Sequence, residues 1–180
     1  MPRARGAFER VLATILAGSP PVADSVDSGC LQLAWIGLRP SRRGSIETPS
    51  SVVAECGRGL HGDHALRGRN YDRQLTLITS ADLEILASAL GRRVDPVQLR
   101  RNLLLQGVST SFRSGDRYRL GEVLLQVTGP CEPCGRMKAA LGQEGFAAMR
   151  GHGGVTARIL RGGLLRLGDA LSPAQMDLFD

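Results

Sequence analysis

The sequence is nearly without lysine and is poor in aromatic residues. Lys138 is the only lysine among 23 basic residues, and aromatic side chains make up 4% of the chain. Because pyridoxal phosphate needs a lysine for its Schiff base, an enzyme built on that cofactor is not expected. Few rings are available to stack on bases, and the arginines are spread along the chain, so a nucleic-acid partner is not expected either.

Long hydrophobic runs and a dense set of cysteines are also missing. No run approaches the ~18 apolar residues of a transmembrane helix, which argues against a membrane partner. A secreted disulfide scaffold would be shorter and richer in cysteine, so we expect free thiols and a cytoplasmic protein. The chain has 180 residues and four cysteines, which are Cys30, Cys56, Cys131 and Cys134.

The N-terminus weakly resembles a secretory signal peptide, because arginines precede a short apolar run and a stretch of small residues. However, Glu9 and Arg10 directly adjoin that run, and Phe8, Val11 and Ile15 fall on one face of a helix. The segment is therefore expected to form an amphipathic helix rather than a signal.

The positive charge of the chain is carried almost entirely by arginine. The formal net charge is +6. Genome composition alone can produce such an excess, and the alternative is an anionic partner, because the planar guanidinium binds phosphate or carboxylate with two parallel hydrogen bonds. A small phosphorylated ligand fits this distribution of arginines at least as well as a polymer does.

Short apolar segments separated by glycine and polar residues dominate the pattern. Alternating or continuous apolar residues predict strands within 30–38, 73–79, 116–129 and 155–171. Several short strands of this kind are typical of a barrel or a sandwich. The expected fold class is therefore mainly β with short helices (α+β).

Two segments carry helix signals, and one carries a loop signal. Residues 80–91 have apolar side chains at helical spacing, with Ser80 as the expected N-cap and Gly91 where the helix ends. A short helix is expected after Asp95, because proline follows this capping residue. The glycine-rich segment 57–70 is expected to be an exposed loop.

One domain is the default for a chain of this length. We expect a helix or tail at 1–28, the domain itself at 29–171, and an acidic C-terminal tail at 172–180.

The pair Cys131 and Cys134 is open to several interpretations. Its C-x2-C spacing is half of a zinc site, for which His61 and His64 would be the other half. The same spacing occurs in redox-active pairs. A third possibility is one reactive thiolate at Cys134, because Arg136 and a possible short helix follow it. A fourth is two thiols with no chemical role.

Five segments of the chain are each weak signals of a family, but their order along the chain makes the set a specific one. They are GRGLHGDHA, RQLTLIT, LRRNLLLQG, GDRYRLGEVLLQVTGPCEPCGRM and RGHGGVTARILRGGLLRLGD. Together they resemble the MOSC domain, the C-terminal domain of molybdenum-cofactor sulfurases, from about residue 30 to about residue 170. The resemblance implies a closed β-barrel-like MOSC fold. It also implies one functional cysteine that follows Pro133 and precedes Met137, which is Cys134.

The resemblance further implies the molybdenum cofactor (molybdopterin), with Cys134 as the catalytic residue and as a ligand of the metal. The phosphate tail of this cofactor makes neutralising arginines physically sensible. The residues at family-like motif positions that are implied for cofactor binding are Asp63, His64, Arg73, Arg101, Asn102 and Arg136.

Three functions follow as hypotheses. The first is an oxidoreductase that reduces N-hydroxylated compounds, a small-molecule substrate class, and receives electrons from a separate donor protein. The second is a sulfur carrier that receives a persulfide on Cys134 from a cysteine desulfurase and delivers it to a metal–sulfur cofactor. The third is a binding module stabilised by zinc. The sequence does not contain the aminotransferase-like or iron–sulfur domains of longer relatives, so an external donor is expected for either of the first two.

Overall fold

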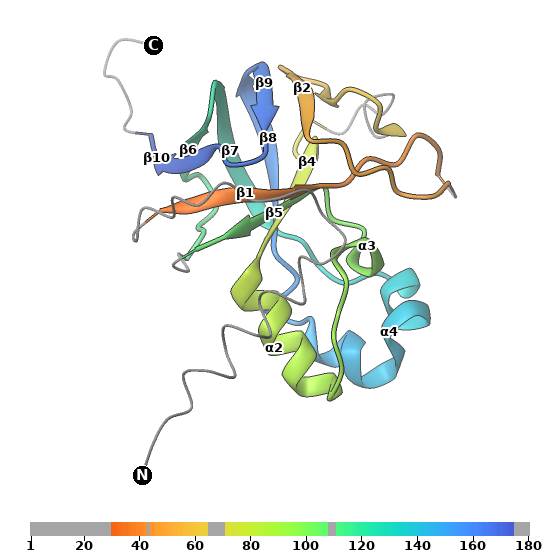
Figure 1. Cartoon of the computed structure of the whole chain (residues 1–180). Helices are drawn as coiled ribbons and strands as arrows, with labels where there is room; N and C mark the ends of the chain where they lie inside the picture. Colours follow the sequence, from red (N-terminus) through yellow and green to blue (C-terminus); the bar gives the residue numbers. More distant parts are fainter. Residues whose placement is uncertain (1–29, 43, 65–70, 108–110, 175–180) are drawn as a thin grey trace.

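The computed structural model describes residues 30–42, 44–64, 71–107 and 111–174 (Figure 1), so the expected N-terminal helix lies outside the described residues. The described elements are, in order, β1 (Leu31–Ile36), β2 (Ser51–Glu55), β3 (Gly59–Leu60), β4 (Leu75–Thr79), α2 (Ser80–Leu90), α3 (Pro96–Leu99), β5 (Leu103–Gln106), β6 (Arg117–Leu120), β7 (Val123–Pro130), α4 (Gly135–Ala148), β8 (Val155–Arg161), β9 (Gly163–Arg166) and β10 (Ala170–Pro173).

Within the described residues, seven strands form a barrel in the order β1-β10-β6-β7-β8-β4-β5, which the pairing of β5 with β1 closes. Every neighbouring pair is antiparallel except β4 and β5, which are parallel. Parallel strands need a crossover connection, and α2 and α3 supply it. The expectation of a mainly β chain that folds as a closed barrel is confirmed.

Alternating side chains determine which face of each strand points into the barrel. In β7, Val123, Leu125 and Val127 are buried, and the residues between them are partly exposed. Ala157 and Ile159 of β8 are buried in the same core. This core consists almost entirely of aliphatic side chains, as the scarcity of aromatic residues predicts.

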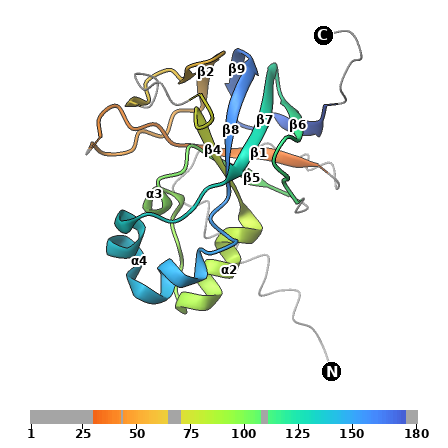
Figure 2. The same ribbon diagram turned by 180° about the vertical axis from the view of Figure 1, so that it is seen from behind.

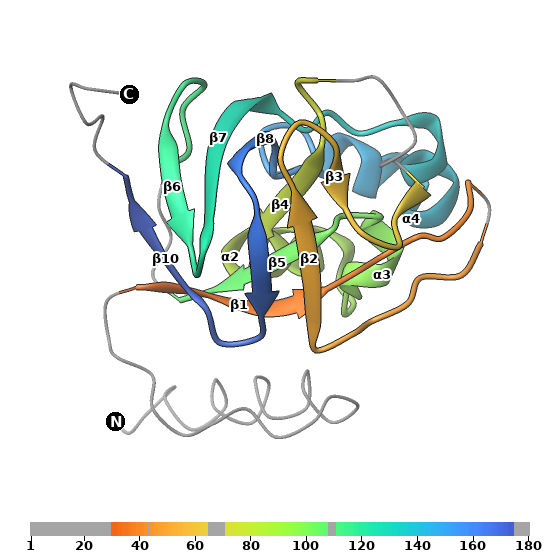
Figure 3. The same ribbon diagram turned by 90° about the horizontal axis from the view of Figure 1, so that it is seen from above.

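A second, small sheet in the order β3-β2-β9 lies beside the barrel (Figure 3). The sequence analysis did not predict β2, and its expectation of an exposed loop at 57–70 is wrong for Gly59, Leu60 and Asp63, although the turn residues around them are exposed. Gly59 and Leu60 form β3 and are buried, because β3 pairs with β2 and β2 pairs with β9. Asp63 is also buried, with 4% of its surface exposed.

The helices begin and end largely where capping residues predict. The N-cap of α2 is Thr79 rather than Ser80, because the Thr79 hydroxyl accepts the Asp82 N–H while the Asp82 carboxylate accepts the Thr79 N–H. Gly91 ends this helix in a left-handed conformation, as expected. Asp95 caps α3 in the same reciprocal way with Gln98.

The helices gather on one side of the barrel and form a second core there (Figures 1 and 2). Strand β4 separates the two cores, since Leu77 packs into the barrel while the neighbouring Ile78 packs against the helices. Leu86 of α2 and Met137 of α4 belong to this second core. α4 is interrupted at Gly142, which is not helical (φ 75°), so a short helix follows Cys134 as expected and a second helical stretch follows it. None of the helices in the described part of the chain has the length and apolarity needed to span a bilayer.

The turn between α4 and β8 offers a test of the packing. Gly151 and Gly154 both have positive φ angles, 80° and 76°. A Cβ atom on Gly154 would lie 2.1 Å from the Leu77 carbonyl oxygen, whereas nothing lies within 4 Å of a Cβ atom on Gly151. Gly151→Ala is expected to lower the free energy of unfolding by about 1–2 kcal/mol through backbone strain. Gly154→Ala is expected to cost a further ~1–3 kcal/mol through the clash. Urea unfolding measures both, and equal losses would contradict the described turn.

Candidate functional site

The ends of four strands meet at one level of the barrel, beside the middle of β4. The register places Ile36, Leu103, Leu77, Val155 and Pro130 side by side. Ile36 and Pro130 end their strands, while Leu103 and Val155 begin theirs. The segments attached to these strand ends therefore meet at the same end of the barrel, although they are far apart in sequence. They are 37–39, 100–102, 131–134 and 152–154.

Arg101 ties three of these segments together. Its side chain is buried, and its Nε donates to the Gly153 carbonyl at 2.7 Å, its Nη2 to the Cys131 carbonyl at 2.9 Å, and its Nη1 to the Leu99 carbonyl at 3.2 Å. No carboxylate among the described residues forms an ion pair with it. Burial lowers the pKa of Arg101 from its ordinary value, and the three carbonyl dipoles compensate for the water that the guanidinium has lost.

The two cysteines of the C-x2-C pair have different surroundings. Cys131 is 1% exposed, and its sulfur accepts a hydrogen bond from Arg73 Nη2 at 3.3 Å. Cys134 is exposed and stands at the N-cap of α4, where its side chain makes no capping hydrogen bond. Both cysteines are free thiols in the structure. The accessible nucleophile of the pair is therefore Cys134.

The surroundings of Cys134 favour its thiolate. Partial burial acts to raise the pKa of this thiol, but the backbone N–H groups of Met137 and Arg136 and the charges of Arg101 and Arg100 act to lower it. The net result is a pKa below the ordinary value for cysteine. A thiolate at the start of a helix and beside positive charge is the usual setting of a reactive cysteine.

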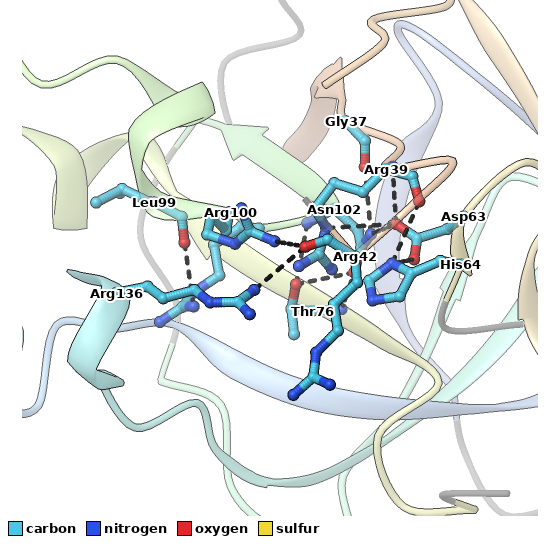
Figure 4. Close-up of polar contacts among 11 residues, drawn as sticks. Gly37, Arg39, Arg42, Asp63, His64, Thr76, Leu99, Arg100, Asn102 and Arg136 are labelled. Carbon is cyan, nitrogen blue, oxygen red and sulfur yellow. Dashed lines mark hydrogen bonds and ion pairs between the residues drawn. The ribbon is translucent and has the colours of Figure 1, made fainter. Parts of the chain in front are cut away.

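An arginine cluster, defined as Arg39, Arg42, Arg100 and Arg136, lies at this end of the barrel (Figure 4). Arg100 Nη2 and Arg136 Nη1 both donate to the Arg42 carbonyl oxygen, at 3.3 and 3.2 Å. Burial lowers the pKa of Arg100, and the positive charges of Arg39 and Arg136 lower it further. Guanidinium groups that repel one another in this way would be stabilised by an anion.

Asp63 and His64 hold the backbone of Arg39. The Asp63 Oδ2 accepts the Arg39 N–H at 3.1 Å and lies 3.6 Å from Arg39 Nε. His64 Nδ1 lies 3.3 Å from Asp63 Oδ1 and 3.2 Å from the Arg39 carbonyl. These contacts fix the chain where it leaves β1 and enters the arginine cluster.

Asn102 is a buried bridge between separate segments. Its Nδ2 donates to the Gly37 carbonyl at 3.2 Å and to Asp63 Oδ2 at 2.9 Å. Its Oδ1 accepts the Thr76 N–H at 3.1 Å and the Thr76 hydroxyl at 3.0 Å. Both amide hydrogens and both lone-pair directions of Asn102 thus have protein partners.

The structure separates the residues selected from the sequence into two kinds of surroundings. Cys134 and Arg136 are exposed, whereas Asp63, Arg101 and Asn102 are buried and bond to other protein groups. His64 is half-buried. Arg73 donates a hydrogen bond to the Cys131 sulfur. The sequence analysis missed three residues of the arginine cluster, namely Arg39, Arg42 and Arg100.

A zinc site made of both pairs is not supported by the described residues. His61 is exposed, and its Nε2 lies 2.8 Å from Glu55 Oε2. No group of three or more histidine, cysteine, aspartate or glutamate side chains in the described ranges is arranged to hold a metal ion.

Comparison with protein families identifies the family of this chain. The family model described as the MOSC domain matches residues 57–172, which is more than half of the chain. No curated protein sequence matches the chain.

Several solved structures share the fold. The YuaD protein from Bacillus subtilis is 17% identical with a TM-score of 0.71, over 78% of this chain and 93% of that one. YiiM from Geobacillus stearothermophilus is 18% identical with a TM-score of 0.65, over 83% of this chain and 77% of that one. YiiM from Escherichia coli is 19% identical with a TM-score of 0.61, over 80% of this chain and 70% of that one. At these identities the likeness concerns the fold alone.

The lowered pKa of Cys134 predicts the pH dependence of its alkylation. Cys30 and Cys56 are first replaced by serine, so that Cys134 is the exposed thiol that reacts. The rate of iodoacetamide labelling should rise with pH, and the midpoint of that rise should lie below the ordinary pKa of cysteine, because the thiolate persists to lower pH. Arg100→Gln should move the midpoint upward by on the order of half a pH unit, since it removes one charge that stabilises the thiolate. Arg92→Gln is the matched control and should leave the midpoint in place. An unchanged midpoint in Arg100→Gln would contradict the electrostatic role of Arg100.

Proposed function

Since this chain belongs to the MOSC domain family, we propose that it binds the molybdenum cofactor through the Cys134 thiolate and reduces N-hydroxylated small molecules with electrons from a separate donor protein. The observation that carries this proposal is the setting of Cys134. It is an exposed thiol with a lowered pKa, and the charges of Arg100 and Arg101 act on it. The pterin sulfurs of the cofactor would supply further ligands to the metal, which agrees with the lack of a multidentate metal cluster among the described side chains.

The chemistry of the residues fits this cofactor at both of its ends. Thiolate is a soft ligand of the kind that thiophilic transition metals prefer. Arginine is the side chain best suited to a phosphate, because its fork can bind two oxygens at once. Arg100 and Arg136 approach the Arg42 carbonyl from different segments of the chain, so a phosphate could replace that neutral oxygen with a charged partner. The bound cofactor would supply a metal that can accept oxygen and electrons.

The buried residues would hold the segments that carry the cofactor-binding groups, rather than contact the cofactor themselves. Asp63 and Asn102 form one hydrogen-bonded network with the backbone of Arg39 and Gly37, so they would fix the chain that carries the arginine cluster. Arg101 would hold the Cys131–Cys134 segment against the turn before β8. His64 is the partly exposed member of the network and remains a candidate for direct contact with the cofactor.

The chain itself offers few groups that could deliver electrons. An iron–sulfur cluster needs about four cysteine ligands, and the chain has four cysteines in all, one of which this proposal assigns to the metal. The electron donor would therefore be another protein. A reducing cytoplasm would keep Cys134 free to bind the metal.

Metal and pterin analysis of protein made in a host that synthesises the cofactor tests the proposal. The wild-type protein should contain molybdenum and pterin in stoichiometric amounts, and Cys134→Ser should contain little molybdenum. Arg100→Gln and Arg136→Gln should each weaken cofactor retention about tenfold, as the loss of a charge-assisted hydrogen bond predicts. Cys56→Ser, at another exposed cysteine, should retain the cofactor.

Protein with an intact Cys134 and no molybdenum or pterin would refute this function. Equal losses in Cys56→Ser and Cys134→Ser would refute the assignment of the ligand.

The exposure of Cys134 favours a second function, that of a sulfur carrier. A thiolate that is accessible to another protein could accept a persulfide from a cysteine desulfurase and pass it to a metal–sulfur cofactor. Incubation with a desulfurase and cysteine should then increase the mass of the protein by one sulfur atom. The gain should persist in Cys56→Ser and disappear in Cys134→Ser. A wild-type protein whose mass does not change would exclude the carrier function for that desulfurase.

A further inference from the structure

The pair Cys131 and Cys134 supports an inference that goes beyond cofactor binding. We propose that Cys134 is a site of oxidation by peroxide and that Cys131 is its resolving thiol, which closes a disulfide within the segment 131–134. The proposal starts from the different exposure of two thiols that only Glu132 and Pro133 separate. Cys134 is open to a small oxidant, whereas Cys131 is 1% exposed and is protected from direct attack.

Cys131 is held in place by three contacts. Its N–H donates to the Gly154 carbonyl at 2.8 Å, its carbonyl accepts from Arg101 at 2.9 Å, and its sulfur accepts from Arg73 at 3.3 Å. The residue therefore keeps its position while its partner reacts. Arg73 would also stabilise negative charge on the Cys131 sulfur at the moment when that sulfur attacks.

The side chain of Cys134 is less constrained than that of Cys131. Its side chain makes no capping hydrogen bond at the start of α4. The next residue is Gly135, and no atom lies within 4 Å of the position that a Cβ atom would take there. The segment 131–134 has no regular secondary structure. The disulfide would therefore require a rearrangement of the segment 131–134 and of the start of α4, and none of these residues belongs to a strand of the barrel.

The chemistry is balanced with peroxide as the oxidant. Hydrogen peroxide transfers one oxygen atom to the Cys134 sulfur, which gives a sulfenic acid and one molecule of water. The Cys131 thiol then attacks that sulfur, the S–S bond forms, and the sulfenic oxygen leaves with the thiol proton as a second water. The two thiols together lose two electrons and two hydrogens to the peroxide. Two equivalents of an external thiol reduce the disulfide again by exchange through a mixed disulfide, and they are themselves oxidised to a disulfide.

The disulfide would have a consequence for the proposed function. It would occupy the Cys134 sulfur and prevent it from binding a metal or a persulfide, so oxidation would switch the site off reversibly. This consequence rests on the proposed function, whereas the disulfide itself does not. The two can therefore fail separately.

Oxidation of the purified full-length chain tests the proposal. The reduced protein is treated with equimolar hydrogen peroxide, remaining thiols are blocked with N-ethylmaleimide, and the protein is cleaved with trypsin. Cleavage after Arg119 and after Arg136 releases the peptide 120–136, which contains Cys131 and Cys134 and no other cysteine. A Cys131–Cys134 disulfide makes this peptide lighter than the dithiol by two hydrogens and keeps N-ethylmaleimide off it until it is reduced. We expect this lighter peptide in the wild type and in Cys56→Ser. Cys131→Ala should instead accumulate a sulfenic acid on Cys134 that reacts with dimedone.

Two results would overturn the proposal. One is wild-type protein in which Cys134 becomes dimedone-reactive while Cys131 stays available to N-ethylmaleimide after denaturation. The other is Cys134 linked to Cys30 or Cys56 instead. Both are read from the wild-type protein, so the test holds even if Cys131→Ala does not fold. Molybdenum content measured on the same reduced protein reports on the cofactor proposal independently.

Discussion

A buried guanidinium that is bonded to backbone carbonyls is the interaction on which the candidate site depends. A buried charge is costly unless its hydrogen-bonding groups are satisfied, and Arg101 is satisfied by carbonyls of Leu99, Cys131 and Gly153. These carbonyls belong to the end of α3, the segment after β7 and the turn before β8. The β5–β4, β4–β8 and β8–β7 pairings together bring these three segments to one place. The site is therefore assembled by the same pairing that closes the barrel.

The charge of Arg101 also has an effect beyond its own hydrogen bonds. Carbonyl dipoles solvate the guanidinium but leave its net charge, which acts on Cys134 together with that of Arg100. Burial and the neighbouring charges of Arg39 and Arg136 disfavour the protonated form of Arg100. Asp63, at 3.6 Å from Arg39 Nε, is a nearby negative group. Such an excess of positive charge around one thiolate favours anionic ligands over neutral ones.

Much of the fold follows from local patterns in the sequence. The alternation in β7 and β8, the end of α2 at Gly91, the cap of α3 at Asp95, and the closed barrel implied by the resemblance are confirmed, whereas the N-cap of α2 lies one residue before the expected Ser80. β2 and β5 were not predicted, since β2 begins within a polar segment that indicates a loop and the four residues of β5 come soon after the end of a short helix. The burial of Asp63 was missed for a different reason. Glycines around it indicate an exposed loop, whereas the pairing of β3 with β2 buries this carboxylate beside partners that are distant in sequence, including Arg39 and the amide of Asn102.

The adjacent arginines Arg100 and Arg101 show why the site needs the fold as well as the motif. In sequence either one could face a ligand, and the sequence analysis selected Arg101. Arg100 adopts a left-handed conformation with φ 55° at the end of α3, which reverses the chain before β5. After that reversal the two side chains diverge, so Arg101 enters the protein while Arg100 reaches the Arg42 carbonyl. A non-glycine residue with positive φ is uncommon and costs free energy. Here that strain accompanies an arrangement in which one arginine supports the Cys131–Cys134 segment and its neighbour joins the arginine cluster, which no pattern of residue types along the chain could distinguish.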